Sequence, residues 1–264
     1  MSSGLEFNDE VNHALKMAYQ TPDIVSARGH VVEALNLIEG QQVLDIGSGP
    51  GLLVRDIAQQ VGPSGAVLGL DMADNMLESA KALCSDFKTV TFKHGDAMSL
   101  PFPDNSFDAV VSTQVYEYVP DLNTALSEFA RVLRPGGRGV IVDTDWAFPY
   151  WHSMDVTIRD RMIEAWKGHC EQESVPMRLP ASIKLSGLQL ENVQALPIMN
   201  RAYDEMNFSY WLSKIIAAFS IGRHGVIQDE AERWLADFEK LDTKGEYFFC
   251  INRYLFELTK PATF

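Results

Sequence analysis

The sequence predicts an α/β fold in which a parallel sheet has helices on both of its faces. Apolar strand-like segments alternate with helical segments from about residue 42 to residue 144. The strand-like segments are short and almost continuously apolar, which is typical of strands that are buried on both faces. The length of 264 residues suits one such domain with a cap, or two small domains.

Two helices are expected before the first strand. Residues 8–19 carry apolar side chains at every fourth position, which predicts a helix. A second helix is expected from residue 22 to about residue 37. Thr21 can cap this helix, Pro22 suits its first position, and Asp23 suits the positive end of the helix dipole.

The middle of the chain alternates regularly between the two kinds of element. Strands are expected at 42–46, 66–71, 89–96, 107–113 and 137–144, and helices at 51–61, 74–83 and 122–133. Glycine and proline follow two of these helices, at Gly62-Pro63 and at Pro135-Gly136, and such pairs end helices. This order predicts strands connected by helical crossovers.

The pattern changes after Thr144, where aromatic residues become frequent. Helices are expected at about 155–170, 206–221 and 229–241, and strands at 191–199 and 247–258. We expect these elements to close over the carboxyl edge of the sheet, while the two strands return to the sheet itself.

Composition and charge exclude several classes of function. The formal net charge of −14 disfavours nucleic acid and anionic membranes as partners. The three cysteines lie far apart and the histidines lack metal-ligand spacing, so we expect no disulfide framework and no metal. The start of the chain lacks the features of a secretory signal, and no apolar run could span a bilayer, so a cytoplasmic location is expected.

The stretch VLDIGSGPG, residues 43–51, places three glycines directly after a predicted strand. Glycine allows a sharp turn and lets a ligand approach the backbone. In a dinucleotide-binding turn the third glycine would come one position later, where this chain has Leu52. Asp45 would repel a pyrophosphate and attract a cation. The turn therefore favours a cationic ligand over a dinucleotide.

Two further acidic residues end the next two predicted strands. Asp71 could accept hydrogen bonds from a ribose diol through its two oxygens. Asp96 could accept a hydrogen bond from the exocyclic amine of a purine, while Ala97 and Met98 pack on the ring. Three acids at three successive strand ends fit a nucleoside with a cationic tail and no phosphate.

Four motifs in sequence order, VLDIGSGPG, GLDMADNML, HGDAMSLPFPDNSFDAVVS and RVLRPGGRGVI, resemble those of class I S-adenosylmethionine-dependent methyltransferases. The resemblance covers roughly residues 20–145 and is greatest to the ubiquinone/menaquinone-type branch that acts on small molecules. It implies a Rossmann-like seven-stranded sheet whose last two strands are 191–199 and 247–258, with a helical lid inserted between them.

The resemblance also divides the chain. It implies N-terminal helices at 1–40 that close over the cofactor, a cofactor-binding core at 41–145, and substrate-cap helices with the last two strands at 146–264. The residues that it assigns to S-adenosylmethionine are Tyr19, Arg28, Asp45, Gly47, Gly49, Gly51, Asp71, Met72, Met76, Asp96, Ala97, Met98 and Gln114. Arg28 could pair with the methionyl carboxylate or be a solvated helix residue, and Tyr19 could close over the cofactor or pack in the core.

Residues for the acceptor come from the loops after the fourth and fifth strands. The candidates for catalysis are His152, Tyr116 and Asp145, and those for substrate binding are Glu117, Trp146, Trp151 and Arg253. His152 could be a general base or pin its loop, and the tryptophans could stack on an acceptor or pack in the core. Glu117 and Tyr118 stand where many relatives carry a His-His pair, which casts doubt on any mechanism that borrows a base from there.

Methyl transfer to an apolar or aromatic metabolite, by in-line displacement, is the function that these features predict. The alternatives are a methyltransferase for protein or RNA, and a cofactor-binding regulator without turnover. An exposed aromatic face on the helices near 206–241 would favour a homodimer over a lid.

Overall fold

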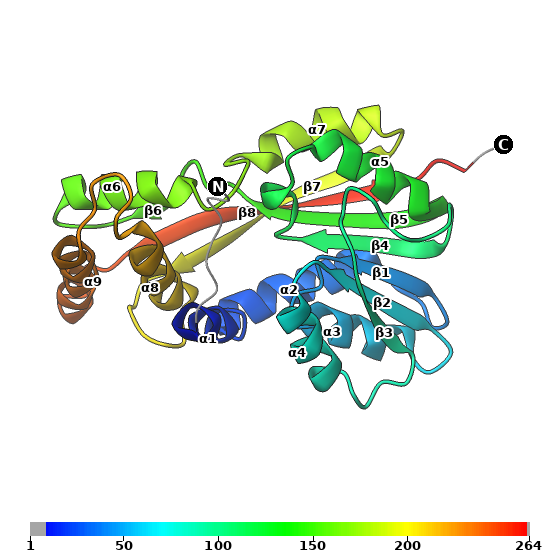
Figure 1. Cartoon of the computed structure of the whole chain (residues 1–264), viewed down its shortest axis with the longest axis horizontal. Coiled ribbons are helices and arrows are strands. Elements are labelled where there is room, and N and C mark those ends of the chain that lie inside the picture. Colours follow the sequence, from blue (N-terminus) through cyan, green and yellow to red (C-terminus); the bar gives the residue numbers. More distant parts are fainter. Residues whose placement is uncertain (1–8, 263–264) are drawn as a thin grey trace. The chain divides into compact units, whose positions relative to one another are not determined.

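The computed structural model describes residues 9–262 of the chain, which folds into an α/β structure (Figure 1). The chain forms two compact units, which are described separately here. The sheet unit contains Arg28–Thr144, Ser174–Ala195 and the described residues from Tyr254 onward. The aromatic unit contains the described residues up to Ala27, together with Asp145–Glu173 and Leu196–Arg253. The three consecutive segments that the resemblance implies stay a prediction.

The sheet unit is built on parallel strands, as the sequence predicts. These are β1 (Gln42–Ile46), β2 (Ala66–Asp71), β3 (Val90–His94), β4 (Phe107–Thr113) and β5 (Leu133–Thr144). The strand order is β3-β2-β1-β4-β5, followed by β8 (Phe249–Thr259), and each pairing from β3 to β5 is parallel. Because parallel strands end at the same edge, the turns that follow β1, β2 and β3 lie on one side of the unit.

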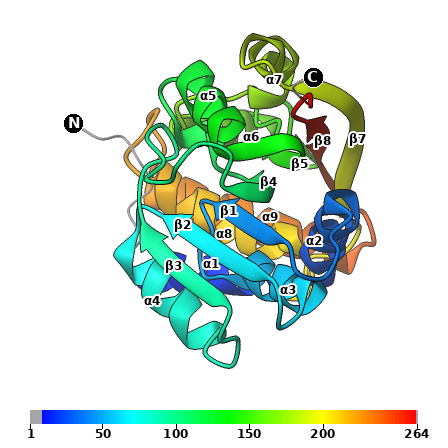
Figure 2. The same ribbon diagram turned by 90° about the vertical axis from the view of Figure 1, so that its right-hand side faces the viewer.

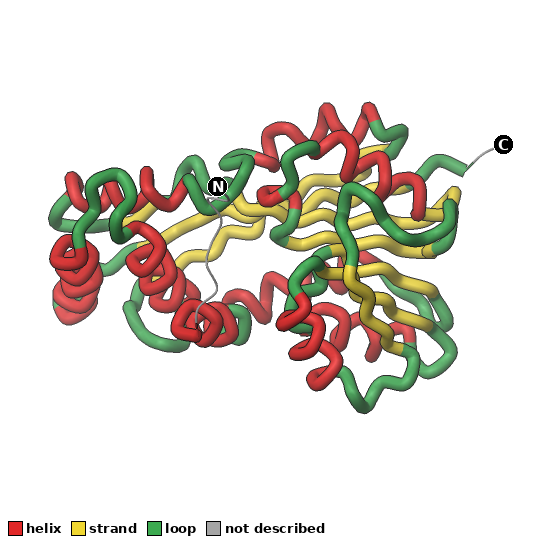
Figure 3. The backbone as a smooth tube through the Cα atoms, viewed as in Figure 1, coloured by secondary structure: helices red, strands yellow, loops and turns green. Residues whose placement is uncertain are grey.

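Helices cover both faces of this sheet (Figure 2). On one face, α3 (Leu52–Val61) and α4 (Asp74–Leu83) pack against β1, β2 and β3. On the other, α5 (Leu122–Val132) and α7 (Val175–Leu185) pack together and against β5. The alternation of strand and helix can be followed along the chain in Figure 3.

Helix α7 was not expected from the sequence. It contains Pro180 in its interior, and a proline there removes a backbone donor and normally interrupts a helix. The helix forms because Val175, Leu179 and Ile183 bury one apolar stripe against the sheet unit's core.

Three elements contain residues of both units. These are α2 (Pro22–Leu35), β7 (Gln189–Asn200) and β8 (Phe249–Thr259). Strand β7 pairs with β8, so the two late strands of the prediction are confirmed as strands of the sheet. The sheet has eight strands where seven were expected, because the two-residue strand β6 (Tyr150–Trp151) pairs antiparallel with the first residues of β8. This pairing satisfies backbone groups that β8 would otherwise leave open.

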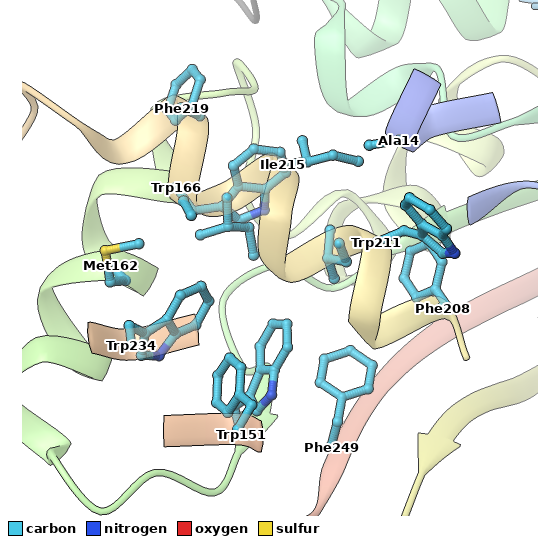
Figure 4. Close-up of a cluster of buried hydrophobic side chains, with 14 of the residues drawn as sticks. Ala14, Trp151, Met162, Trp166, Phe208, Trp211, Ile215, Phe219, Trp234 and Phe249 are labelled. Atoms are coloured by element: carbon cyan, nitrogen blue, oxygen red, sulfur yellow. The ribbon is translucent and has the colours of Figure 1, made fainter. Parts of the chain in front are cut away.

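The aromatic unit is built from helices around one buried cluster. Its full helices are α1 (Asp9–Ala18), α6 (Val156–Lys167), α8 (Phe208–Ser220) and α9 (Gln228–Thr243). Figure 4 shows the large side chains that these elements bury together. The ring of Trp151 stacks on that of Phe238 at 5.0 Å and lies 4.5 Å from that of Phe249. All five tryptophans of the chain belong to this unit.

Candidate cofactor site

The glycine turn after β1 has the conformation that its sequence predicts. Gly47, Gly49 and Gly51 have φ values of 72°, 50° and 83°, a region that other residues rarely adopt. The backbone N–H groups of Gly47 and Ser48 both donate to the carbonyl of Leu70, at 2.7 and 2.9 Å, which holds the turn against β2.

The three glycines serve different purposes. A Cβ on Gly47 would lie 2.2 Å from Val115, and one on Gly51 would lie 2.9 Å from the Cβ of Ala80. These two positions therefore need glycine so that neighbouring elements can pack closely. A Cβ on Gly49 would meet no atom of the described chain within 4 Å. The turn thus exposes bare backbone to open space at Gly49.

Asp71, the last residue of β2, fixes this turn. Its Oδ2 accepts from the N–H of Gly49 at 2.8 Å, and its Oδ1 accepts from the N–H of Ala73 at 2.9 Å. Each carboxylate oxygen has a further lone pair, so the half-buried side chain can also accept from hydroxyl groups of a ligand. The sequence did not indicate that Asp71 would organise the glycine turn as well as face a ligand.

Asp45 lies inside β1, beside Gly69 of β2 in the register of the parallel pair. Its side chain is 1% exposed, and Oδ1 has no hydrogen-bond partner among the described residues. Burial raises the pKa of Asp45 well above its ordinary value, and the negative charge of Asp71 raises this pKa further.

Ser48 is a polar residue of this site that the sequence analysis missed. Its hydroxyl is buried without a partner in the part of the chain that the structure describes. Its Oγ would lie 2.8 Å from a Cβ on Gly69, the residue beside Asp45. Its place between two glycines of the turn was the signal that could have found it. The unpartnered oxygens of Asp45 and Ser48 fit a ligand that brings hydrogen-bond donors and positive charge.

The turn after β3 carries the third acid. The Oδ1 of Asp96 accepts from the N–H of Met98 at 2.8 Å, which closes the turn locally. Ala97 is buried, whereas Met76 and Met98 are half-buried. Met72, which follows β2, is 64% exposed. Strand order and direction therefore bring all three acids to the carboxyl edge, as predicted.

The segment after β4 begins with Gln114, whose φ of 58° is unusual for a residue with a side chain. Its Nε2 donates to the carbonyl of Val142, and its Oε1 accepts from the hydroxyl of Thr144. The side chain therefore ties the end of β4 to the end of β5.

A buried polar cluster follows, formed by Tyr116 and Glu117 together with Ser112 of β4 and Asp143 of β5. Burial raises the pKa of Tyr116, so this phenol stays protonated and can donate a hydrogen bond but cannot act as a base. Burial and the charge of Glu117 raise the pKa of Asp143. Asp143 was not singled out in the sequence, although it stands at a strand end like the three other acids.

Arg28 lies on α2 and pairs with an acid of α3. Its Nε donates to the Oδ2 of Asp56 at 2.7 Å. The guanidinium has further N–H groups that this ion pair does not use. Its expected contact with a methionyl carboxylate therefore stays a prediction.

The remaining predicted residues belong to the aromatic unit. These are Tyr19, Asp145, Trp146, Trp151, His152 and Arg253. His152 is exposed, and its backbone N–H donates to the carbonyl of Phe248. The Oδ1 of Asp145 accepts from the N–H of Ala147 at 3.3 Å, as a residue that pins its loop would. Tyr19 is half-buried against the aromatic cluster.

Trp146 and Trp151 are both buried among other rings. The indole N–H of Trp151 donates to the hydroxyl of Tyr247 at 3.0 Å, and the ring of Trp146 lies 4.9 Å from that of His169. Arg253 is 7% exposed, with its guanidinium 5.1 Å from the ring of Phe208. These contacts account for the two tryptophans as core residues, and contact with an acceptor stays a prediction for all three.

Neither a metal site nor a membrane-spanning helix is found among residues 9–262. No group of three or more His, Cys, Asp or Glu side chains there could hold a metal ion. No helix in that range is long and apolar enough to cross a membrane.

Comparison with known proteins identifies the segment that carries this site. Residues 44–141 match the family model described as "Methyltransferase domain". This segment is therefore similar to methyltransferase domains. Over 117 residues the chain is 41% identical to a demethylmenaquinone methyltransferase of Staphylococcus epidermidis, which covers 44% of this chain and 48% of that protein. The chain thus spans about half the length of the curated relatives it matches. The resemblance to class I methyltransferases of the ubiquinone/menaquinone type is confirmed.

Solved structures confirm the fold of the chain. The YcgJ protein of Bacillus subtilis superposes with a TM-score of 0.62 at 22% identity, covering 90% of this chain and all of that one. Phosphoethanolamine N-methyltransferase 2 of Haemonchus contortus, solved in complex with S-adenosyl-L-methionine, superposes with a TM-score of 0.57 at 20% identity. That match covers 89% of this chain and 52% of the other. At these identities the likeness shows the Rossmann-like fold.

Proposed function

We propose that this chain transfers a methyl group from S-adenosylmethionine to a small-molecule acceptor. The observation that carries the proposal is the arrangement of Asp45, Asp71 and Asp96 around a glycine turn that is open at Gly49. The match of residues 44–141 to the methyltransferase-domain family model supports this reaction class. The relative solved with S-adenosyl-L-methionine supports the choice of cofactor.

Each part of the cofactor finds a suitable group at this edge of the sheet. Asp71 has lone pairs for the ribose hydroxyls, and its contact with Gly49 holds the turn in place. Asp96 would accept from the adenine amine, with Ala97, Met98, Met72 and Met76 as apolar contacts. Asp45 and Ser48 would face the cationic amino-acid end, and Gly47 and Gly51 shape the turn.

S-adenosylmethionine supplies a methyl group that is already activated by its sulfonium. The chain's own part is therefore to hold the reacting groups in line and to exclude water, which can lower a barrier by roughly 7–11 kcal/mol. An acceptor that must lose a proton also needs a base. His152 and Asp145 are the candidates, whereas Tyr116 would act as a hydrogen-bond donor because its phenol stays protonated.

Two observations favour a small molecule as the acceptor. The formal net charge of −14 opposes the approach of nucleic acid. The demethylmenaquinone methyltransferase relative is named for a small acceptor. We propose that Glu117, Trp146, Trp151 and Arg253 contribute to the acceptor site, with no metal involved.

Binding of S-adenosylhomocysteine, measured by isothermal titration calorimetry, is the first test. We expect saturable binding at one site per chain. Absence of heat and of any thermal stabilisation, at ligand concentrations of about 1 mM, would remove the proposal, since this corresponds to a binding free energy weaker than about −4 kcal/mol.

Transfer itself is tested with S-adenosylmethionine labelled on its methyl group and an extract separated by size. Label in the small-molecule fraction is expected. Label in the protein or RNA fraction would favour the macromolecular alternative, and binding without any transfer would favour a regulator. A heat-denatured sample of the protein controls for spontaneous methylation.

A further inference from the structure

Asp45 occupies an unusual position for an ionised carboxylate. It is fully enclosed in the sheet unit, and its Oδ1 has no hydrogen-bond partner among the described residues. The hydroxyl of Ser48, which lies next to the same Gly69 position, also lacks a partner among those residues. An unpaired buried charge costs more than an unpaired neutral group, so the neutral carboxyl is the favoured form before a ligand binds.

The neighbouring charges strengthen this preference. Asp71 lies on the same face of β2 as Gly69, the register partner of Asp45, and repels a second negative charge there. Asp71 differs from Asp45 in its surroundings, because two backbone N–H groups donate to it and its side chain is only half-buried. Of these two acids, Asp45 is therefore the one whose buried Oδ1 lacks a donor among the described residues.

The other elements packed on β1 bring little positive charge to offset a negative charge on Asp45. The charged residues of α3 are Arg55 and Asp56, and Asp56 accepts from Arg28 of α2 at 2.7 Å. The acid of β4, Asp108, lies near its amino end and accepts from the N–H of Gln42 and from Arg134. Asp71 is the only one of these charged groups that contributes to the raised pKa of Asp45.

We infer that Asp45 carries a proton before the cofactor binds and releases it to solvent when the cofactor's ammonium group enters beside it. This inference rests on the proposed function. The ammonium keeps its own protons and supplies both the opposite charge and the donor that Oδ1 lacks. The carboxyl O–H bond breaks, the proton passes to the buffer, and Asp45 becomes the counter-ion of the bound amino-acid end.

The sign of the pH dependence follows from this exchange. Only the ionised form of Asp45 pairs with the ammonium, so binding is tightest above the pKa of Asp45 in the free protein. Below that pKa, each pH unit weakens binding by up to about tenfold, because one proton must be removed for each ligand bound. The same linkage predicts that proton release per ligand increases as the pH falls through this range.

Calorimetry in paired buffers measures the proton directly. S-adenosylhomocysteine is titrated into the whole chain between about pH 5.5 and about pH 8.5, in buffers of low and high protonation enthalpy. We expect up to one proton released per ligand at the acidic end and fewer at the alkaline end. 5′-Methylthioadenosine, which lacks the amino-acid group, is expected to bind without proton release and is the matched ligand control.

Two variants assign the proton to its residue. Asp45→Asn keeps the shape of the side chain, and we expect it to bind S-adenosylhomocysteine with no proton release and little pH dependence. Asp71→Asn removes the repelling charge, and we expect the onset of proton release to move to lower pH. Asp104→Asn, at an exposed acid outside the proposed cofactor site, should leave proton release unchanged. Thermal unfolding of each variant shows that it is folded.

The outcomes separate this inference from the proposed function. If neither adenosyl ligand binds, the proposed function fails. If S-adenosylhomocysteine binds the unmodified chain without proton release at any pH tested, only the inference fails. Equal proton release in the chain and in its Asp45→Asn variant would overturn it as well.

Discussion

Asp71 has two roles in this proposal, because the same carboxylate orders the glycine turn and faces the proposed ribose position. The N–H groups of Gly49 and Ala73 donate to it at 2.8 and 2.9 Å. Hydrogen bonds to a charged group are worth about 1.5–3 kcal/mol each. A loss of binding on substitution would therefore combine a missing ligand contact with a less ordered turn.

Replacing Asp71 should weaken ligand binding in graded steps. We expect Asp71→Ala to weaken binding of S-adenosylhomocysteine by about tenfold to about a hundredfold, which corresponds to about 1.4–2.8 kcal/mol. Asp71→Asn keeps one acceptor oxygen and should fall between Asp71→Ala and the unmodified chain. Isothermal titration at one pH gives both values. Equal affinity in all three proteins would contradict the role of this carboxylate.

Asp143 should affect stability in a pH-dependent manner. Its pKa is raised by burial and by Glu117, so the folded state binds a proton that the unfolded state releases above its ordinary pKa of about 4. Stability is therefore lost as pH rises from the unfolded pKa to the folded pKa. We expect Asp143→Asn to raise the free energy of unfolding at neutral pH by about 1–3 kcal/mol, since the amide is neutral in both states without binding a proton.

Urea unfolding at about pH 7 and about pH 4 checks this expectation. The gain from Asp143→Asn should shrink toward the lower pH, where an aspartic acid side chain is neutral in both states. Asp104, an exposed acid that pairs with Arg131, provides the matched control as Asp104→Asn. A gain that is equal at both pH values would show that ionisation of Asp143 is not its cause.

At the scale of elements, the glycine turn shows how one short motif meets two separate demands. Gly51 is the N-cap residue of α3 and lies against Ala80 of α4, so glycine is needed there for packing. Gly49 has a similar positive φ but faces open space. Sequence spacing alone could not distinguish these two glycines.

The two positions give a matched pair of alanine variants. Gly51→Ala should lose about 1–2 kcal/mol of stability to its left-handed conformation and about 1–3 kcal/mol more to overpacking. Gly49→Ala should lose only the first contribution, while its Cβ enters the open space and weakens S-adenosylhomocysteine binding at least about tenfold. Urea unfolding and titration calorimetry measure the two effects. The reverse ranking in stability would contradict the packing role of Gly51.

The helices and strands between residues 42 and 144 were predicted well, whereas two elements after Thr144 were missed. Helix α5 begins at Leu122 as expected, because Asp121 accepts from the N–H groups of Asn123 and Thr124. Helix α7 was missed because Pro180 conceals an apolar stripe that only packing against the sheet reveals. Strand β6 was missed because two residues carry no periodic signal and form a strand only by pairing with β8.

At the scale of the whole molecule, the excess of acidic residues is the dominant long-range feature. The formal net charge of −14 implies self-repulsion in the compact state, which salt screens. We expect the melting temperature to rise by a few degrees between about 20 mM and about 300 mM sodium chloride. Scanning calorimetry with sodium chloride and potassium chloride in parallel is the measurement, and both salts should act alike.

A fall in melting temperature with salt would indicate that paired charges outweigh the repulsion. Arg131 is the centre of an ion-pair network of this kind, because it donates to Glu128, Asp104 and two backbone carbonyls. Salt would weaken these ion pairs. Arg131→Met removes this network while keeping much of the side-chain volume, so it should make the rise with salt steeper.

The sequence by itself determined the alternation of strands and helices, the glycine turn and the three strand-end acids, because these depend on local periodicity and on residue chemistry. It also determined the methyltransferase resemblance, which is carried by contiguous motifs. Only the tertiary structure decided which glycine is open to a ligand and that Asp71 holds the turn. It alone also showed that the Oδ1 of Asp45 and the hydroxyl of Ser48 are buried with no hydrogen-bond partner among residues 9–262. Burial and hydrogen bonding depend on residues that are distant in the chain, so no local pattern contains them.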